Sequence, residues 1–327
     1  MPLCGAADRL PPWQLESLGG AEGAVVAARR AWAATCEDIR RNRPELLVLS
    51  CEHIVLQTNG IQKARLAELL SPLSSDVTPV IYVRHPVDHY RSRLQQSIKH
   101  RDRHFPPVGL KLPEAIHDSE AAFGRSPELV AFDRKVMYGG DVVYDFATRF
   151  LAPWVNPADL PSLNSNVGLS AEALVLLIRL RAEAGGTYEA SRRVARLIPV
   201  LERLDMSDPP SQPLTLLPEV AEAALRCSVG YRWLAETGRL RIPGLDLDKI
   251  DGAPVPDWMK AAPPESLFFH DPQRLDRLRS ALEKRQSDSG SGTPLRNSSV
   301  VPMPSPVNRL SRYILRKLMP IVNRKNG

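Results

Sequence analysis

The amino-acid sequence predicts an α/β protein, in which a parallel sheet flanked by helices forms the first half and a largely helical second half follows. Up to about residue 160, short apolar runs alternate with helix-patterned segments, which is typical of buried parallel strands joined by helices. From residue 170 to residue 284 the pattern is helical, with no clear strand. We therefore expect an α/β core over residues 1–165 and a helical region over 166–284 that packs on it.

Along the first half, the Ala- and Arg-rich residues 22–42 predict a helix, which the Gly19-Gly20 pair introduces. The run LLVLS at 46–50 is continuously apolar and predicts a buried strand. The segment IQKARLAELL at 61–70 has helical periodicity.

The next strand is predicted at 79–84, PVIYVR, because it is rich in β-branched and aromatic residues. A helix follows, and Pro86 suits its first turn. A helical stretch around 127–138 and a third strand, DVVYDF at 141–146, complete the predicted core. In the second half, helices are expected in AEALVLLIRLRAEA, YEASRRVARLIPVLERL and PEVAEAALRCSVGYRWLAE.

The composition excludes several classes of protein. Hydrophobic residues make up 43% and charged residues 24%, which excludes a fully disordered chain and a fibre. No run reaches the ~18–20 apolar residues that span a bilayer, and the N-terminus lacks a signal-peptide pattern, so we expect a cytoplasmic protein. The cysteines form no C-x-x-C pair, which excludes zinc fingers and thioredoxin-like motifs; they are Cys4, Cys36, Cys51 and Cys227.

The positive charge is concentrated in the C-terminal tail. The net charge of the whole chain is +6, and residues 285–327 alone contain eight Lys and Arg residues and one acidic residue. The rest of the chain is close to neutral and has no basic stripe with aromatic residues, so we expect no nucleic-acid partner.

Within this tail, residues 285–306 are rich in Ser, Gly and Pro and predict a flexible linker. Residues 307–327 are basic and amphipathic, and 307–319 have helical spacing. Such a helix suits an anionic membrane surface, which would make the protein peripheral at a membrane. Docking on the body or on a partner, or no stable structure, are the alternatives.

A phosphate site is predicted in VIYVRHPVDHYRSRL. Arg84 ends a strand, and ligands of parallel sheets bind beyond the carboxyl ends of the strands. The start of the next helix favours an anion, and Ser92 lies in its second turn. A guanidinium and a hydroxyl so placed can grip one phosphate.

This segment resembles the 3′-phosphate-binding motif of the sulfotransferases that use 3′-phosphoadenosine 5′-phosphosulfate (PAPS), in which a strand ends in Arg and a Ser follows eight residues later. The resemblance implies a P-loop-like sulfotransferase core, with Arg84 and Ser92 binding the nucleotide. The upstream LLVLSCEHI is similar to a family strand that ends in Ser-Ser-Glu, which implies Glu52, or less well His53, as the base on the acceptor. The segment NSNVGLS also resembles the Asn-x-Ser-Leu-Ser stretch of bacterial relatives.

One family element is missing. The family opens with a strand and a Lys-x-Gly-Thr-Thr loop that binds the 5′-phosphosulfate. The Gly19–Gly23 segment has no preceding apolar strand, no Lys and no following Thr or Ser. The chain is thus expected to be an N-terminally shortened or a degenerate member.

Other chemistry has weaker support. The pairs His85/His89 and His100/His104 have metal-ligand spacing but no evident third ligand, so we expect no metal. Motifs of common hydrolases, dehydrogenases and NTPases are missing. The sequence therefore leaves two hypotheses: a PAPS-dependent sulfotransferase acting on a hydroxyl or amine of a saccharide or lipid-linked acceptor, or a non-catalytic binding or scaffold protein that acts through its helical half and basic tail.

Overall fold

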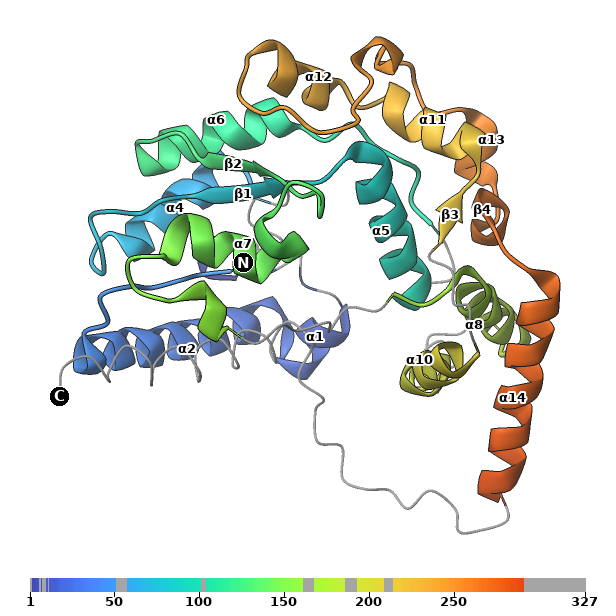
Figure 1. Cartoon of the computed structure of the whole chain (residues 1–327). Coiled ribbons are helices and arrows are strands. Elements are labelled where there is room, and N and C mark those ends of the chain that lie inside the picture. Colours follow the sequence, from blue (N-terminus) through green and yellow to red (C-terminus); the bar gives the residue numbers. More distant parts are fainter. Residues whose placement is uncertain are drawn as a thin grey trace.

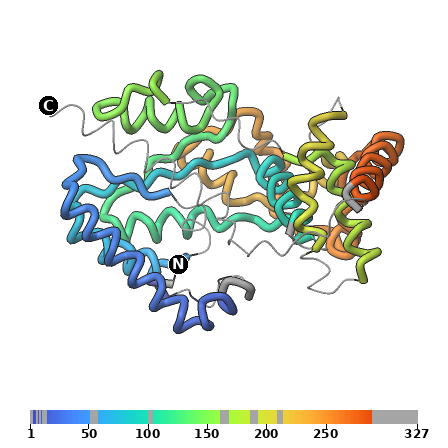
Figure 2. The backbone as a smooth tube through the Cα atoms, turned by 90° about the horizontal axis from the view of Figure 1, so that it is seen from below, coloured from blue at the N-terminus to red at the C-terminus, as the bar shows by residue number. Residues whose placement is uncertain are grey.

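A computed structural model of the whole chain shows a mostly helical protein with two small sheets (Figure 1). The second half of the chain lies beside the first, as the view from below also shows (Figure 2). The structure describes residues 2–5, 7, 10, 12–50, 58–100, 104–160, 168–185, 193–208 and 214–290.

The parallel sheet of the first half has two strands among the described residues. Strand β1 (Val80–Val83) confirms the strand predicted at 79–84, and it pairs with β2 (Glu128–Ala131) from Val80 opposite Glu128 to Val83 opposite Ala131. Ile81 and Val83 are buried and alternate with less buried neighbours, because successive side chains of a strand point to opposite faces.

Helices surround this sheet and confirm the three helices predicted before residue 101 (Figure 1). At the start of the second of them, Asn59 and Gln62 form a reciprocal capping box, which satisfies two otherwise free N–H groups. The larger helices here are α2 (Gly20–Asn42), α4 (Gly60–Leu70), α5 (Pro86–His100) and α6 (Leu112–Phe123).

Three predictions in the first half were wrong. Residues 46–50 form no strand; Leu46 and Val48 instead pack against the apolar cluster of Ala147, Leu151 and Val155. The helix expected around 127–138 is replaced by β2 and the turns after it, since Val130 and Ala131 are buried in pairing with β1.

The strand expected at 141–146 is helix α7 (Val142–Phe146). The Asp141 carboxylate accepts hydrogen bonds from the N–H groups of Val143 (2.8 Å) and Tyr144 (3.0 Å), so it caps a helix start. Inside α7, Asp145 is fully buried and accepts a hydrogen bond from the Tyr82 hydroxyl of β1 (2.7 Å). Capping and this tertiary contact outweigh the strand propensity of Val-Val-Tyr.

The shorter elements of the first half connect these helices and strands. They are η1 (Pro2–Cys4), α1 (Pro12–Ser17), η3 (Tyr138–Gly140), the π-helical η4 (Ala147–Leu151) and η5 (Pro157–Asp159).

The second half is helical as predicted, except for a two-stranded antiparallel sheet that the sequence did not predict. In it Thr215 pairs with Phe269 and Leu216 with Phe268; strands of two residues are too short for an alternating pattern. Helix α14 ends at Gly290 and so includes the first residues of the predicted linker. The elements are α8 (Ala171–Glu183), α10 (Ile198–Ser207), β3 (Thr215–Leu216), α11 (Pro218–Arg226), α12 (Val229–Glu236), η6 (Leu247–Lys249), α13 (Asp257–Ala261), η7 (Pro264–Leu267), β4 (Phe268–Phe269) and α14 (Pro272–Gly290).

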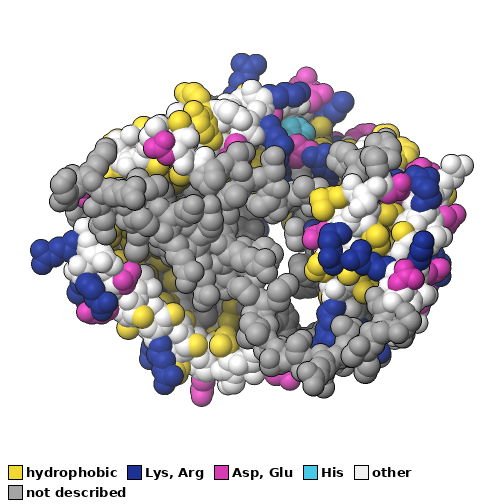
Figure 3. All heavy atoms as spheres, turned by 60° about the horizontal axis from the view of Figure 1, so that its bottom comes forward, with side chains coloured by type: hydrophobic (Ala, Val, Ile, Leu, Met, Phe, Trp, Pro, Cys, Tyr) yellow, Lys and Arg dark blue, Asp and Glu magenta, His cyan; other side chains and the backbone are white. Residues whose placement is uncertain are grey.

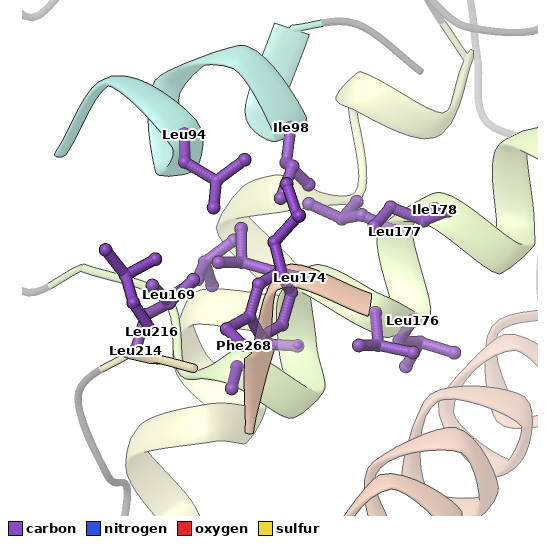
Figure 4. Close-up of a cluster of buried hydrophobic side chains, with 14 of the residues drawn as sticks. Leu94, Ile98, Leu169, Leu174, Leu176, Leu177, Ile178, Leu214, Leu216 and Phe268 are labelled. Carbon is purple, nitrogen blue, oxygen red and sulfur yellow. The ribbon is translucent and has the colours of Figure 1, made fainter. Parts of the chain in front are cut away.

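Helix α5 lies between two apolar cores. Its residues Leu94 and Ile98 belong to the larger core, where they face Leu174 and Leu177 of α8 (Figure 4). Val87, in its first turn, packs against this core and also against the core around β1 and α6. Helix α5 therefore joins the two halves of the molecule.

On the face that Figure 3 shows, Lys and Arg side chains lie among Asp and Glu side chains. Exposed pairs of this kind are found along α14, where Arg279 bonds to both Glu183 and Glu283 at 3.1 Å. The charge of Arg279 is thus offset by the two acids beside it.

Candidate functional site

The junction of β1 and α5 places Arg84 where the sequence predicted it. Strand β1 ends at Val83, and α5 begins at Pro86. The first helical hydrogen bond of this turn runs from the His89 N–H to the His85 carbonyl (2.8 Å). Arg84 therefore stands at the carboxyl end of a parallel strand and directly before a helix start, a place where anions are favoured.

The Arg84 side chain is half-buried and lies against the ring of Phe132, with its guanidinium carbon 4.3 Å from the ring centroid. Phe132 follows β2 directly, and its N–H donates to the Val83 carbonyl (2.8 Å). Burial lowers the pKa of Arg84, and Asp88 acts in the opposite direction; a guanidinium remains charged at neutral pH. Stacking on Phe132 fixes this charge at the edge of the sheet.

Arg84 has charges of both signs nearby but no ion-pair partner among the described residues. Asp88 is already paired with Arg91 at 3.0 Å. In the part of the chain that the structure describes, no carboxylate lies within 4.0 Å of the Arg84 guanidinium. Among the charges that act on the pKa of Arg84, Asp88 has the largest effect and raises it, whereas Arg91 and Arg134 lower it.

Ser92 lies in the second turn of α5, as predicted. At a rise of 1.5 Å per residue, it stands about 9 Å along the helix axis from Pro86. It is half-buried. An anion held by both Arg84 and Ser92 would thus lie beside the first two turns of α5.

The candidate base, Glu52, and its weaker alternative, His53, lie outside the described residues. The same holds for the first part of NSNVGLS, and for residues 307–319, the predicted membrane contact. Their roles stay predictions.

Ser170, the last residue of NSNVGLS, has its hydroxyl engaged in the fold. It is buried, and its Oγ accepts hydrogen bonds from the Ala173 N–H (3.2 Å) and from Arg274 (2.6 Å). Its own N–H donates to Asp205 (2.7 Å). Ser170 thus caps α8 and ties it to α10 and α14.

A small pocket, which was not predicted from the sequence, lies between the first turns of α5 and the start of α12. It is partly open to solvent and has room for about one water molecule. One wall is a face of α5 that carries Pro86, His89, Tyr90 and Arg93, a spacing that is visible in the sequence. The opposite wall comes from residues far along the chain. The lining residues are Pro86, His89, Tyr90, Arg93, Pro107, Val108, Leu110, Ala224, Ser228 and Tyr231.

Two tyrosines that line this pocket have buried hydroxyls without a hydrogen-bond partner. Tyr90 and Tyr231 are 2% and 1% exposed, and neither hydroxyl makes a hydrogen bond in the structure. Burial raises the pKa of both phenols, so both keep their protons at neutral pH. Burial, together with Arg93 and Arg84, lowers the pKa of His89 to about 4, so this imidazole is neutral.

The segment that the sequence analysis compared with a 5′-phosphosulfate loop is a helix start. Gly19 and Gly20 have φ values of 77° and 86°, and α2 begins at Gly20. A positive φ is easy for glycine alone. Among the residues described before it there is a short helix, α1, and no strand.

The described residues contain no group of three or more His, Cys, Asp or Glu side chains that could hold a metal ion. In the same part of the chain, no helix has both the length and the apolar character needed to cross a membrane. In comparisons with known proteins, no family, curated protein or solved structure matches this chain.

Proposed function

We propose that this chain is a sulfotransferase-like protein that binds PAPS through its 3′-phosphate and transfers the sulfuryl group to a hydroxyl or amine of a saccharide or lipid-linked acceptor. The observation that carries the proposal is the β1–α5 junction, where Arg84 stands without a carboxylate partner among the described residues and Ser92 follows in the second turn. A guanidinium fork and a hydroxyl suit the oxygens of a phosphate monoester.

In the proposed transfer, the acceptor oxygen or nitrogen attacks sulfur in line, and the bond from sulfur to the phosphate oxygen of the nucleotide breaks. The acceptor proton goes to Glu52, and the other product is 3′-phosphoadenosine 5′-phosphate (PAP). Arg84 and Ser92 hold the nucleotide so that the reacting atoms stay aligned, which is a positioning contribution. The tail at 307–319 would bring the protein to an anionic membrane where lipid-linked acceptors are made.

A second function, a non-catalytic binding or scaffold protein with this fold, is favoured by one observation. The Gly19-Gly20 segment begins a helix rather than forming a loop after a strand, so the described residues hold no 5′-phosphosulfate loop. Without such a loop, charge that develops during transfer loses its main stabilisation.

Thermal unfolding of the full chain with PAP tests the nucleotide site. A ligand at about 100 times its dissociation constant adds roughly 2.7 kcal/mol to the stability of the folded state, a shift of several degrees for a chain of this size. We expect this shift in the wild type and not in Arg84→Ala. Arg125→Ala is the matched control, because Arg125 pairs with Asp76 on the surface (3.0 Å) and leaves the junction intact.

A transfer assay then separates the two functions. A sulfated product that is lost in Glu52→Gln supports the sulfotransferase. A PAP shift without any product supports the non-catalytic binder. The absence of a PAP shift in the wild type contradicts the nucleotide site itself.

A further inference from the structure

We infer that Phe132 is a positioning residue of the phosphate site: its ring holds the Arg84 guanidinium in the place where the 3′-phosphate of the nucleotide binds. Phe132 thereby determines how strongly the site prefers a nucleotide that carries this phosphate. The inference rests on the proposed function, and it adds a residue that acts through Arg84 without contacting the ligand.

The backbone of the sheet places Phe132 beside Arg84. Val83, the last residue of β1, pairs with Ala131, the last residue of β2. The Phe132 N–H donates to the Val83 carbonyl (2.8 Å), which extends the contact of the two chains past the strand ends. Phe132 and Arg84 are thus the first residues after the two strands, and the guanidinium carbon of Arg84 lies 4.3 Å from the centroid of the Phe132 ring.

The Phe132 ring rests on a neighbour that is itself held in place. The ring of Tyr82 meets it edge to face, at 6.3 Å between centroids and 82° between planes. The Tyr82 hydroxyl donates to the fully buried Asp145 (2.7 Å), which also accepts from Nε of Arg149 (2.9 Å). Burial raises the pKa of Tyr82, so the hydroxyl keeps its proton and stays a donor. A chain of contacts therefore runs from a buried carboxylate to the ring under Arg84.

This contact leaves Arg84 able to bind phosphate. The attraction between a guanidinium and a ring face uses the positive charge and none of the N–H donors. The donors remain for the oxygens of a phosphate. A long side chain also loses rotamer freedom when it binds a ligand, and a guanidinium that is already held in position loses less. The ring therefore strengthens phosphate binding from a distance.

A second contribution concerns Asp88, in the first turn of α5. Asp88 pairs with Arg91 (3.0 Å) and has the largest effect among the charges that act on Arg84. A guanidinium released from Phe132 would be free to turn toward this carboxylate, and an ion pair there would compete with phosphate. The contact with Phe132 therefore keeps Arg84 available to the nucleotide.

The test compares two nucleotides by titration calorimetry on the full chain: PAP, and adenosine 5′-monophosphate (AMP), which lacks the 3′-phosphate. We expect the wild type to bind PAP more tightly than AMP, and Arg84→Ala to lose this preference. Phe132→Leu should weaken PAP binding about 3–30-fold, the range that one cation–π contact supports, and leave AMP binding unchanged. Phe132→Tyr keeps the ring face and should keep the preference.

The control is Phe269→Leu, the same substitution at an exposed phenylalanine of β4 (56% exposed), which should leave both affinities unchanged. Thermal unfolding without nucleotide shows which variants fold. If Phe132→Leu does not fold, Phe132→Met takes its place, because a flexible methionine fills irregular space in a core and also lacks the ring.

The outcomes separate this inference from the proposed function. A wild type that prefers PAP, with Arg84→Ala losing and Phe132→Leu keeping the preference, overturns the inference and leaves the nucleotide site standing. Equal weakening of PAP and AMP in Phe132→Leu means that Phe132 only supports the fold, which also overturns it. A wild type that does not prefer PAP to AMP contradicts the 3′-phosphate site, and the inference falls with it.

Discussion

Replacing Arg274 with leucine leaves two buried carboxylates without their cation. In the second half of the molecule, Arg274 of α14 donates from Nη1 to Glu172 (2.7 Å) and from Nη2 to Asp205 (2.6 Å). The three side chains are 4%, 6% and 4% exposed. Three helices, α8, α10 and α14, are thus connected through one guanidinium.

The expected cost follows from this burial. Removing one partner of a buried ion pair costs about 3–5 kcal/mol, because the remaining charge is left uncompensated. The carbonyl oxygens of Asp205 (3.1 Å) and Asp208 (3.0 Å) lose a donor as well, at about 1 kcal/mol each. Since a typical domain is stable by only about 5–15 kcal/mol, we expect Arg274→Leu to be close to unfolding at 37 °C.

Urea denaturation measures this cost. With a slope of about 3 kcal/mol per molar urea, the midpoint falls by about 1 M or more. The control is Arg277→Leu on the same helix: Arg277 is 52% exposed and lies 3.4 Å from Asp208, so its loss costs about 0–1 kcal/mol. Neutralising the acids in Arg274→Leu, with Glu172→Gln and Asp205→Asn, should restore part of the stability.

The reasoning is refuted by either of two results. One is a midpoint for Arg274→Leu that equals the midpoint of Arg277→Leu. The other is no recovery on neutralisation, which would mean that lost packing, and not uncompensated charge, accounts for the effect.

Three further predictions concern buried polar groups. Burial acts to raise the pKa of Glu172, but its hydrogen bonds have the larger combined effect and hold the pKa below the ordinary 4.5. The stability that the wild type has over Glu172→Gln is therefore present above about pH 4.5 and is lost as the pH falls through the folded-state pKa. Urea midpoints of the two proteins that keep a constant difference down to about pH 2 would contradict this. Tyr82→Phe removes the hydroxyl that bonds to the buried Asp145 and should cost about 1.5–3 kcal/mol, whereas the exposed Tyr144→Phe should cost almost nothing in the same urea titration. Burial lowers the pKa of Lys63, so folding releases a proton at pH values between the folded-state pKa and the ordinary 10.5. The wild type should therefore gain stability relative to Lys63→Met as the pH rises through that range. The opposite trend would show that Lys63 is held in its charged form.

The pattern of residues along the sequence predicted the structure correctly where contacts within one strand–helix unit determine it. The strand at 79–84, the helix that begins at Pro86 and the places of Arg84 and Ser92 all lie within one strand–helix unit. The strand at 128–131 and the helix at 142–146 were predicted the other way round. The strand depends on the pairing of β2 with β1, and the helix on the contact of Asp145 with Tyr82. These contacts join residues about 50–60 positions apart, beyond the reach of any periodicity.

The pocket was missed for the same reason. Four of its residues share a face of α5, and that pattern alone indicates a buried helix face. Only the approach of α12 brings Ser228 and Tyr231 to the same place. Two glycines permit this approach: a Cβ at Gly230 would lie 2.4 Å from the Leu110 carbonyl oxygen, and one at Gly109 2.4 Å from that of Cys227. A glycine at a close contact is visible in a sequence, but its partner is not.

The position of α5 between the two apolar cores has a practical consequence for cutting the chain. A fragment that ends before α8 would keep β1 and Arg84 but would expose Tyr90, Leu94 and Ile98, which α8 and its neighbours normally cover. Such an uncovered stripe favours aggregation. Biochemical work on the β1–α5 junction therefore calls for a piece that extends through α14, and an inactive short fragment would say nothing about the site.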